Sequence, residues 1–361
     1  MDPVEIELPT YRILIARGAL AEVGRVASAT TRAHRYAVIA DANVAPLYAA
    51  RVRSALGEGR TRLYTIPAGE EQKTRANWST LTDALLGDDF GRDSAIIALG
   101  GGVIGDLAGF IAATYMRGIP FIQVPTTLLA MIDASIGGKT GVDTPAGKNL
   151  VGAFHDPAAV IADPDVLRTL PTEHLRAGLA EAIKHGVIAD ASHFDEVVGA
   201  APEILSGSRA AAAALERIVV RSVAIKSDVV KRDKREGGVR KTLNFGHTIG
   251  HAIEFRSAYR MLHGEAVAVG MVVESRVAEQ LGVAERGTSD RVRAAVETTG
   301  LPAARPAEQS PAEILAATRH DKKARAGVVE YALPARIGEM AGADSGWGVP
   351  VSDEVVLGAL Q

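Results

Sequence analysis

The stretch Ala95–Phe110, which reads AIIALGGGVIGDLAGF, indicates the fold class of this chain. It begins with a short apolar run, as expected for a strand that is buried on both faces of a parallel sheet. Consecutive glycines follow, and then a segment with helical character. A glycine-rich turn between a strand and a helix lets bare backbone approach a pyrophosphate, while the helix N-terminus supplies N–H groups and positive potential.

The glycine turn fits the dinucleotide fingerprint at Gly100, Gly102 and Gly105. By itself it is equally compatible with an ordinary tight strand–helix turn. It also lies deep in the chain, and no acidic residue follows about twenty positions later, where a ribose-binding carboxylate is usually found. A better ribose-binding candidate is Asp41, at the end of the earlier apolar run Val38–Ala40, although a turn or helix cap is the commoner fate of such an aspartate.

Working outward from this turn, the first half of the chain alternates short apolar strands with helices. This alternation predicts an α/β domain with a Rossmann-like parallel sheet over residues 1–170. The expected strands are Tyr36–Ala40, Arg62–Ile66, Ala95–Leu99, Phe121–Val124 and Val160–Ala162, and the expected helices include Ala76–Leu86 and Ile104–Tyr115.

Beyond Leu170-Pro171-Thr172 helical spacing dominates, which predicts a mostly α-helical domain over residues 171–361. A long helix is expected at Arg209–Arg232, with Ile218, Ser222, Lys226 and Val230 on one face and a stop at the turn Arg235–Gly238. Further helices are expected at Asn244–Phe255 and Glu265–Leu281.

Composition limits the kinds of site that the chain can build. Of 361 residues, 40 are basic and 43 acidic, a net charge of −3, and 47% are apolar. We therefore expect a sizeable core, and neither nucleic acid nor a membrane as a partner. The chain has no cysteine, so a metal would need His, Asp or Glu. No segment resembles a signal peptide or a membrane span, and we expect a cytoplasmic protein.

A second glycine-rich run, Asp133–Asp143, is followed by Gly147-Lys148-Asn149. Its Gly137-Gly138-Lys139-Thr140 is not a phosphate-binding P-loop, because that motif needs a glycine where Asp133 stands. The lysines and the asparagine would still suit a phosphate, whereas the run taken alone favours a solvated loop.

Three histidines form the strongest candidate for a metal site. His247 and His251 are four residues apart on one expected helix face, and His263 follows with Glu265. Upstream, Glu181 and Lys184 share one helical turn. Two such histidines and a carboxylate can bind zinc, but the spacing does not show which two histidines are ligands.

In combination, these motifs resemble the 3-dehydroquinate synthase family of sugar phosphate cyclases, and the resemblance covers essentially the whole chain. The matching segments are Ile66–Lys73, Gly100–Asp106, Pro125–Thr127, Gly137–Thr140, Gly147–Asn149, Gly178–Lys184, Leu243–Glu254, Leu262–Gly270 and Asp321–Lys323. The resemblance implies a homodimer with an NAD-binding N-terminal domain, a metal-binding C-terminal domain and an active site between them.

The resemblance also implies roles for individual residues. Zinc, or cobalt as a substitute, would be bound by Glu181, His247 and His263. The implied NAD-binding residues are Asp41, Asn43, Glu70, Lys73, Gly101, Gly102, Val103, Ile104, Gly105, Asp106, Thr126, Thr127, Lys139, Lys148, Val166, Leu167, Arg168 and Thr169. The implied catalytic and substrate-binding residues are Asp133, Lys139, Asn149, Lys184, Lys226, Arg240, Asn244, His251, Arg117 from the other subunit, and Lys322 or Lys323.

The implied substrate is 3-deoxy-arabino-heptulosonate 7-phosphate, whose phosphate would meet Lys139, Asn149, Asn244 and His251. The implied reaction oxidises a ring carbinol transiently with NAD, eliminates phosphate, returns the hydride and closes a carbocycle, so that NAD is regenerated. Alternatives are another sugar phosphate cyclase, such as 2-deoxy-scyllo-inosose or epi-valiolone synthase, and a metal-dependent polyol dehydrogenase. A catalytically dead binding protein is disfavoured, because none of the expected polar positions is lost.

Overall fold

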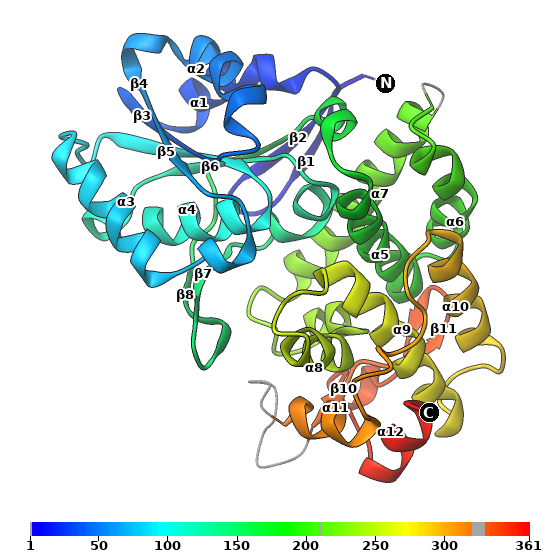
Figure 1. The fold of residues 1–361 in the computed structure, drawn as a ribbon. Helices are drawn as coiled ribbons and strands as arrows, with labels where there is room; N and C mark the ends of the chain where they lie inside the picture. The colour runs from blue at the N-terminus through cyan, green and yellow to red at the C-terminus, as the bar shows by residue number, and fades with distance from the viewer. Residues whose placement is uncertain (1, 209–210, 320–328) are drawn as a thin grey trace. The chain divides into compact units, whose positions relative to one another are not determined.

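A computed structural model describes residues 2–208, 211–319 and 329–361 of the chain (Figure 1). These residues form two compact units, Met1–Leu170 and Pro171–Gln361. In the described ranges, no helix combines the length and apolarity needed to cross a membrane.

The first unit is built on one seven-stranded sheet with the order β1-β2-β9-β6-β5-β3-β4. All neighbouring strands are parallel except β1 and β2, so the expected parallel sheet is confirmed and an antiparallel edge strand is added. The five expected strands are all present. The sheet strands are β1 (Val4–Glu7), β2 (Arg12–Ile15), β3 (Arg35–Asp41), β4 (Thr61–Ile66), β5 (Ser94–Gly100), β6 (Phe121–Pro125) and β9 (Ala159–Ala162).

Helices cover both faces of this sheet, as its apolar strands require. The blue helices α1 (Val23–Thr30) and α2 (Ala50–Leu56) lie on one face, and the cyan helices α3 (Arg75–Gly87) and α4 (Gly102–Thr114) lie on the other (Figure 1). Helix α4 packs closely on β6, because a Cβ at Gly105 would lie 2.7 Å from the Gln123 amide. The glycine of the fingerprint therefore has a packing role in addition to any role toward a ligand.

The glycine-rich run after Asp133 is only partly a loop. Residues 135–138 form turns, and from Lys139 onward the chain forms an antiparallel hairpin of β7 (Lys139–Thr144) and β8 (Gly147–Phe154). The hairpin was missed because glycines and lysines interrupt its strand pattern, but Val142, Val151 and Ala153 pack against the core beneath α4. Val142 is fully buried and Val151 and Ala153 are partly buried, and this packing supports a hairpin in a segment whose composition favours a loop.

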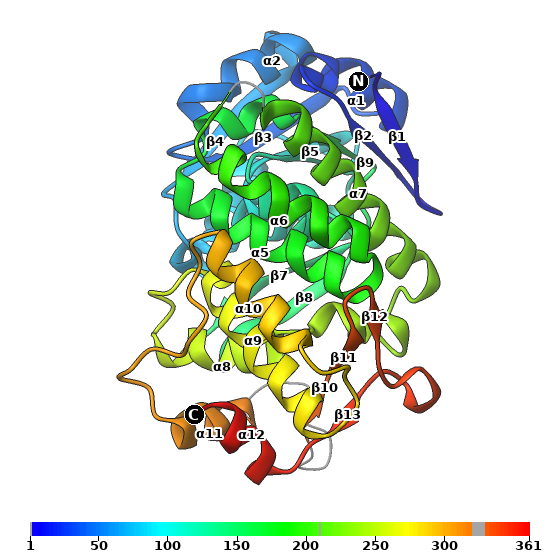
Figure 2. The same ribbon diagram turned by 90° about the vertical axis from the view of Figure 1, so that its right-hand side faces the viewer.

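The second unit is mostly helical, as expected (Figure 2). Its helices are α5 (Thr172–Ala189), α6 (Ala191–Leu205), α7 (Ala211–Arg232), α8 (His247–Arg256), α9 (His263–Gln280), α10 (Thr288–Thr298), α11 (Pro311–Thr318) and α12 (Asp353–Ala359). Its short strands are β10 (Glu330–Tyr331), β11 (Pro334–Arg336), β12 (Glu339–Met340) and β13 (Val349–Pro350). The predicted face of α7, with Ile218, Ser222, Lys226 and Val230, is buried, and the predicted start of this helix at Arg209 lies outside the described residues.

The expected start of α8 at Asn244 is wrong. Asn244 ends a 3-10 turn, Val239–Asn244, and the helix begins only at His247. The reason is Gly246, which has a φ of 77° and breaks the helical path between the two segments. Asn244 and His247 therefore belong to different elements.

Helices α8 and α9 are held in close contact by glycines, which allows a prediction about stability. A Cβ at Gly270 would lie 1.9 Å from the backbone oxygen of Gly246, so Gly270→Ala must push the two helices apart. We expect Gly270→Ala to lower the free energy of unfolding by about 2–4 kcal/mol in urea denaturation. Gly199→Ala is the matched control, because nothing lies within 4 Å of its added Cβ on α6. That change should stabilise by roughly 0.5–1 kcal/mol, and equal effects of the two changes would contradict this account of α8–α9 packing.

Candidate active site

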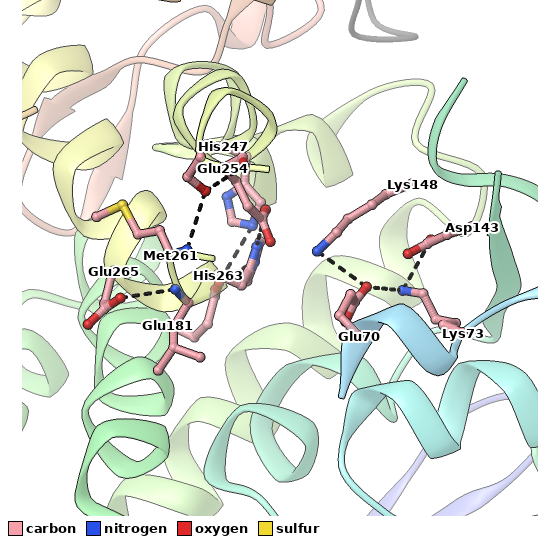
Figure 3. Close-up of polar contacts among 12 residues, drawn as sticks. Glu70, Lys73, Asp143, Lys148, Glu181, His247, Glu254, Met261, His263 and Glu265 are labelled. Atoms are coloured by element: carbon pink, nitrogen blue, oxygen red, sulfur yellow. Dashed lines mark hydrogen bonds and ion pairs between the residues drawn. The ribbon is translucent and has the colours of Figure 1, made fainter. Parts of the chain in front are cut away.

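The strongest candidate for a metal site lies inside the second unit, where a carboxylate from α5 meets histidines from α8 and α9 (Figure 3). Oε1 of Glu181 lies 3.5 Å from Nε2 of His247 and 3.4 Å from Nε2 of His263. Two ligands of a tetrahedral zinc, each bonded at about 2.0–2.1 Å, are about 3.3–3.4 Å apart. Both distances from the Glu181 carboxylate therefore fit a zinc-sized ion.

Both histidine rings are held with Nε2 available as a ligand atom. Nδ1 of His247 lies 3.1 Å from the carbonyl oxygen of Phe245, and Nδ1 of His263 lies 3.2 Å from Oε2 of Glu254. A carbonyl or carboxylate oxygen can only accept, so Nδ1 donates in each case, and a ring without a proton on Nε2 presents the lone pair of that atom. This is the usual outer support of a metal-bound histidine.

The charges around the cluster shift the pKa values of its proposed ligands in different directions. Burial alone would raise the pKa of Glu181, but Lys184 and the two histidines outweigh burial and hold the pKa well below its usual value. Nζ of Lys184 lies 2.5 Å from Oε2 of Glu181. Burial would lower the pKa of His263, yet its hydrogen bonds with Glu181 and Glu254 raise it to about 9. Burial and the Lys184 ammonium hold the pKa of His247 well below its usual value, so its neutral ring is available to a metal.

His251 lies beside the other two histidines. Ligand atoms of His247, His251 and His263 all lie within 4.8 Å of one another. The structure thus gathers every histidine of the sequence motif, and their proximity leaves the choice between Glu181 and His251 as third ligand to experiment.

The cations predicted to meet the substrate in the second unit are buried. Lys226 on α7 and Arg240 in the 3-10 turn are 6% and 2% exposed. The turn before Arg240 is organised by Asp233, whose carboxylate accepts the N–H groups of Gly238 and Arg240 at 2.7 and 3.1 Å. Arg240 Nη1 donates to the carbonyl of Lys234. A buried guanidinium fixed in this way is set up for anion recognition.

In the first unit the predicted cofactor residues follow the carboxyl ends of parallel strands. Asp41 ends β3, Gly101–Asp106 follows β5, Thr126 and Thr127 follow β6, and Val166–Thr169 follows β9. Asp41 accepts the N–H groups of Asn43 and Val44, both at 2.9 Å, so it does have the turn role considered as its alternative. Ligands of open α/β sheets bind at this edge.

Two observations at this edge fit a phosphate-bearing cofactor. Helix α4 begins after Gly101 with no side chain capping its first N–H groups. The buried hydroxyl of Thr126 has no hydrogen-bond partner among the described residues. Helix N–H groups and an unsatisfied buried donor are features that a dinucleotide could complete.

Lys73 sits in a carboxylate cluster near this edge (Figure 3). Its Nζ lies 2.7 Å from Glu70, 3.5 Å from Asp106 and 3.6 Å from Asp143, while Lys148 Nζ lies 3.3 Å from Glu70. Burial raises the pKa of Asp106 to about 6, although Lys73 acts in the opposite direction. The cluster brings together four of the predicted cofactor residues with Asp143.

The remaining predicted residues of the first unit occupy three places. Lys139 begins β7 and Asn149 lies in β8, where its N–H donates to Asp143 at 2.9 Å. Asp133 lies in a short π-helical turn, Ala130–Ala134, just before the hairpin. Arg117 is exposed in a turn whose residues Met116, Arg117 and Gly118 all have positive φ. Lys322 and Lys323 lie outside the described residues.

Sequence reasoning missed four acidic residues that support the candidate site: Asp143, Asp233, Glu236 and Glu254. Glu236 accepts from Asn244 Nδ2 at 2.6 Å, and Glu254 supports His263. Their signal was weak, because an isolated acidic residue next to a glycine turn or on a helix usually faces solvent. Only the tertiary contacts show their role.

The chain is similar to the proteins of one family over most of its length. The family model described as 3-dehydroquinate synthase N-terminal matches residues 63–177, and the one described as 3-dehydroquinate synthase C-terminal matches residues 178–324. A curated 3-dehydroquinate synthase from Symbiobacterium thermophilum is 46% identical over 93% of this chain and 94% of its own length.

Two solved structures are also similar over nearly their whole length. One is 2-deoxy-scyllo-inosose synthase complexed with carbaglucose-6-phosphate, NAD+ and Co2+, at 26% identity, a TM-score of 0.86 and 99% coverage of both chains. The other is the 2-epi-5-epi-valiolone synthase of Streptomyces hygroscopicus with NAD+ and Zn2+ bound, at 30% identity and a TM-score of 0.86, covering 98% of this chain and 97% of that one.

Proposed function

This chain belongs to the 3-dehydroquinate synthase family, and on that premise we propose that it converts 3-deoxy-arabino-heptulosonate 7-phosphate to 3-dehydroquinate and phosphate. This reaction belongs to the shikimate pathway of aromatic amino acid biosynthesis. The observation that carries the proposal is the spacing of the Glu181 carboxylate from Nε2 of His247 and His263, which fits a zinc-sized ion. The two solved relatives contain NAD+ with Zn2+ or Co2+, and we propose NAD and the same kind of metal here.

When bound, the nicotinamide supplies a reversible hydride acceptor and the metal supplies a Lewis acid for the carbinol oxygen. Glu181, His247 and His263 hold the ion, and Lys184 keeps Glu181 ionised through their ion pair. Residues 171–361 are the proposed metal- and substrate-binding domain, and residues 1–170 are the proposed NAD-binding domain.

The substrate carries a phosphate and a carboxylate, and we propose separate partners for each. Lys139, Asn149, Asn244 and His251 bind the phosphate, together with Arg117 of the partner subunit in a homodimer. Lys226, Arg240 and a lysine from the pair Lys322 and Lys323 bind the carboxylate. Asp133 is proposed to support the phosphate-binding run. We further propose that the dimer acts in the cytoplasm.

The alternative activities are less favoured by the comparisons. Curated relatives named 3-dehydroquinate synthase are 41–47% identical to this chain over most of its length. The cyclases for other sugars are 26–30% identical to this chain. Buried Arg240 and Lys226 agree with this order, because a sugar without a carboxylate could not form the charge-assisted hydrogen bonds proposed for these two cations.

Substrate choice tests the proposal directly. We expect turnover of the heptulosonate phosphate and at least about tenfold lower kcat/KM for glucose 6-phosphate and sedoheptulose 7-phosphate, because neither offers the carboxylate. Arg240→Ala should lower kcat/KM for the heptulosonate at least about tenfold, since a charge-assisted bond is worth roughly 1.5–3 kcal/mol. Phosphate release with each sugar is the measurement.

The neighbouring Lys241→Ala is the control for Arg240→Ala. Lys241 forms an ion pair with Glu330 at 2.9 Å and has no proposed role toward the substrate. Its removal should leave kcat/KM within about twofold of the wild type, as expected for a partly exposed pair. Comparable turnover of all three sugars, or an unchanged kcat/KM in Arg240→Ala, would exclude the carboxylate assignment.

A further inference from the structure

Glu274 is a buried carboxylate without a role in the site described so far. It lies on α9 with 0% of its surface exposed, about three turns after His263. Its Oε2 accepts the N–H of Gly246 at 2.6 Å, and its Oε1 accepts the N–H of Ile249 at 3.1 Å. One side chain of α9 therefore satisfies two backbone donors at the start of α8.

Helix α8 depends on this external acceptor because its own sequence provides no cap. Its N-cap residue is Gly246, which has no side chain to accept a hydrogen bond. Another residue at that position is excluded by the close approach of α9, since a Cβ on Gly246 would lie 2.5 Å from the Met271 side chain and 2.9 Å from the Val267 oxygen. The usual Ser, Thr, Asp or Asn cap cannot be used here, and Glu274 replaces it.

The two hydrogen bonds bracket a proposed metal ligand. His247 is the first residue of α8 and lies between Gly246 and Ile249 in the chain, while His263 is the first residue of α9. Fixing the start of α8 to the body of α9 therefore fixes the two histidines relative to each other. An error of about 0.5 Å in ligand placement is enough to impair such a site.

Charge gives Glu274 a second effect. The N-terminus of a helix carries a positive end equivalent to roughly half an elementary charge, and a divalent ion bound by the first residue of α8 would be repelled by it. A carboxylate bound to those same N–H groups offsets this repulsion. A neutral side chain of equal size would not.

We propose that Glu274 is a positioning residue of the metal site, which holds His247 in place and offsets the positive end of α8. The proposal rests on the metal-binding role proposed above for His247 and His263. It goes beyond that role because it makes metal affinity depend on a side chain that contacts neither the ion nor the substrate.

The test is metal binding by Glu274→Gln, measured on the full chain after removal of its metal. Glutamine has the same shape, but it carries no charge and offers one acceptor oxygen for two N–H groups. We expect Kd for Zn2+ to rise about tenfold or more, as for other outer partners of metal ligands, with a change in the visible absorption of bound Co2+. Zn2+ competition with a chromophoric chelator and Co2+ titration measure the two effects.

Val277→Ala is the matched control for a purely structural role. Val277 lies three residues further along α9, is fully buried in the apolar core and carries no charge or hydrogen-bonding group. It should lower the thermal midpoint while leaving the Kd for Zn2+ and the Co2+ spectrum as in the wild type. A Glu274→Gln protein that behaves in the same way, destabilised but with unchanged Zn2+ affinity and Co2+ spectrum, would show that Glu274 is only a helix cap and overturn the inference.

The wild type distinguishes this failure from failure of the proposed function. A wild-type protein that binds neither Zn2+ nor Co2+ would overturn the metal site itself and the inference with it. If the wild type binds one ion per chain and Glu274→Gln has the same Zn2+ affinity and Co2+ spectrum, the role of Glu274 would be overturned. The proposed metal site would then still stand.

Discussion

Glu181→Ala is expected to lose its metal and to lower turnover at least about a thousandfold. The substitution removes one of three proposed protein ligands and leaves the Lys184 ammonium beside the site without the carboxylate that lies 2.5 Å from it. Lewis-acid catalysis is worth several kcal/mol, and about 4 kcal/mol corresponds to about a thousandfold in rate. Metal content after dialysis and phosphate release on added substrate measure the two effects.

His251→Ala is the informative comparison, because all three histidines of the cluster lie close enough to share an ion. If Glu181 is the third ligand, His251→Ala keeps its metal and loses turnover through weaker phosphate binding. The opposite pattern, in which Glu181→Ala keeps full metal occupancy and His251→Ala loses it, would replace the proposed ligand set with three histidines.

Lys73→Met is expected to produce the largest loss of stability in the first unit. The Lys73 ammonium is buried among Glu70, Asp106 and Asp143, and its removal leaves their negative charges close together. Breaking a buried ion pair costs about 3–5 kcal/mol, and we expect the lower end because the carboxylates are partly exposed. Urea unfolding followed by the fluorescence of Trp78, which lies in α3, would report on this unit once Trp347 has been replaced by Phe.

The stability lost in Lys73→Met should increase as the pH rises. Burial raises the pKa of Asp106 from 3.8 to about 6 in the folded chain, so its ionisation costs stability as pH rises through that range. Without Lys73 the carboxylates repel more strongly, and the deficit of Lys73→Met should grow between about pH 4 and pH 7 and nearly vanish below pH 4. Lys148→Met, which removes the 3.3 Å pair with Glu70, should cost about 1 kcal/mol or less. Equal losses in the two variants would contradict the role given to Lys73.

The sequence predicted the fold where local pattern and tertiary burial agree. The buried strand Ser94–Gly100 is apolar at every position after Ser94, and the buried face of α7 repeats at helical spacing, so both are visible from the chain alone. The β7–β8 hairpin could not be predicted from the chain alone. Its order depends on a few apolar side chains packed under α4, and its other residues are typical of a loop. The late start of α8 depends on the positive φ of Gly246, which close packing with α9 requires.

The candidate site was predictable only in part. Its histidines were identified from spacing, but the choice of Glu181 as a ligand came from the resemblance and not from the residue pattern. The carboxylates that support the site, Glu254 on α8 and Glu274 on α9, act through contacts between helices that no local pattern records. Asp41 illustrates the limit of a local prediction, because the structure shows it capping a turn, a role that does not bear on whether it also binds a ribose.

The ratio of phosphate released to NADH formed tests the central proposal most directly. Purified wild-type protein with its metal would be given excess heptulosonate phosphate and NAD far below the substrate concentration. The proposed cyclase oxidises and then re-reduces its substrate, so we expect many phosphates per NAD, no accumulation of NADH and a carbocyclic product. One NADH for each substrate consumed, with no phosphate released, would instead indicate a polyol dehydrogenase and contradict the proposal.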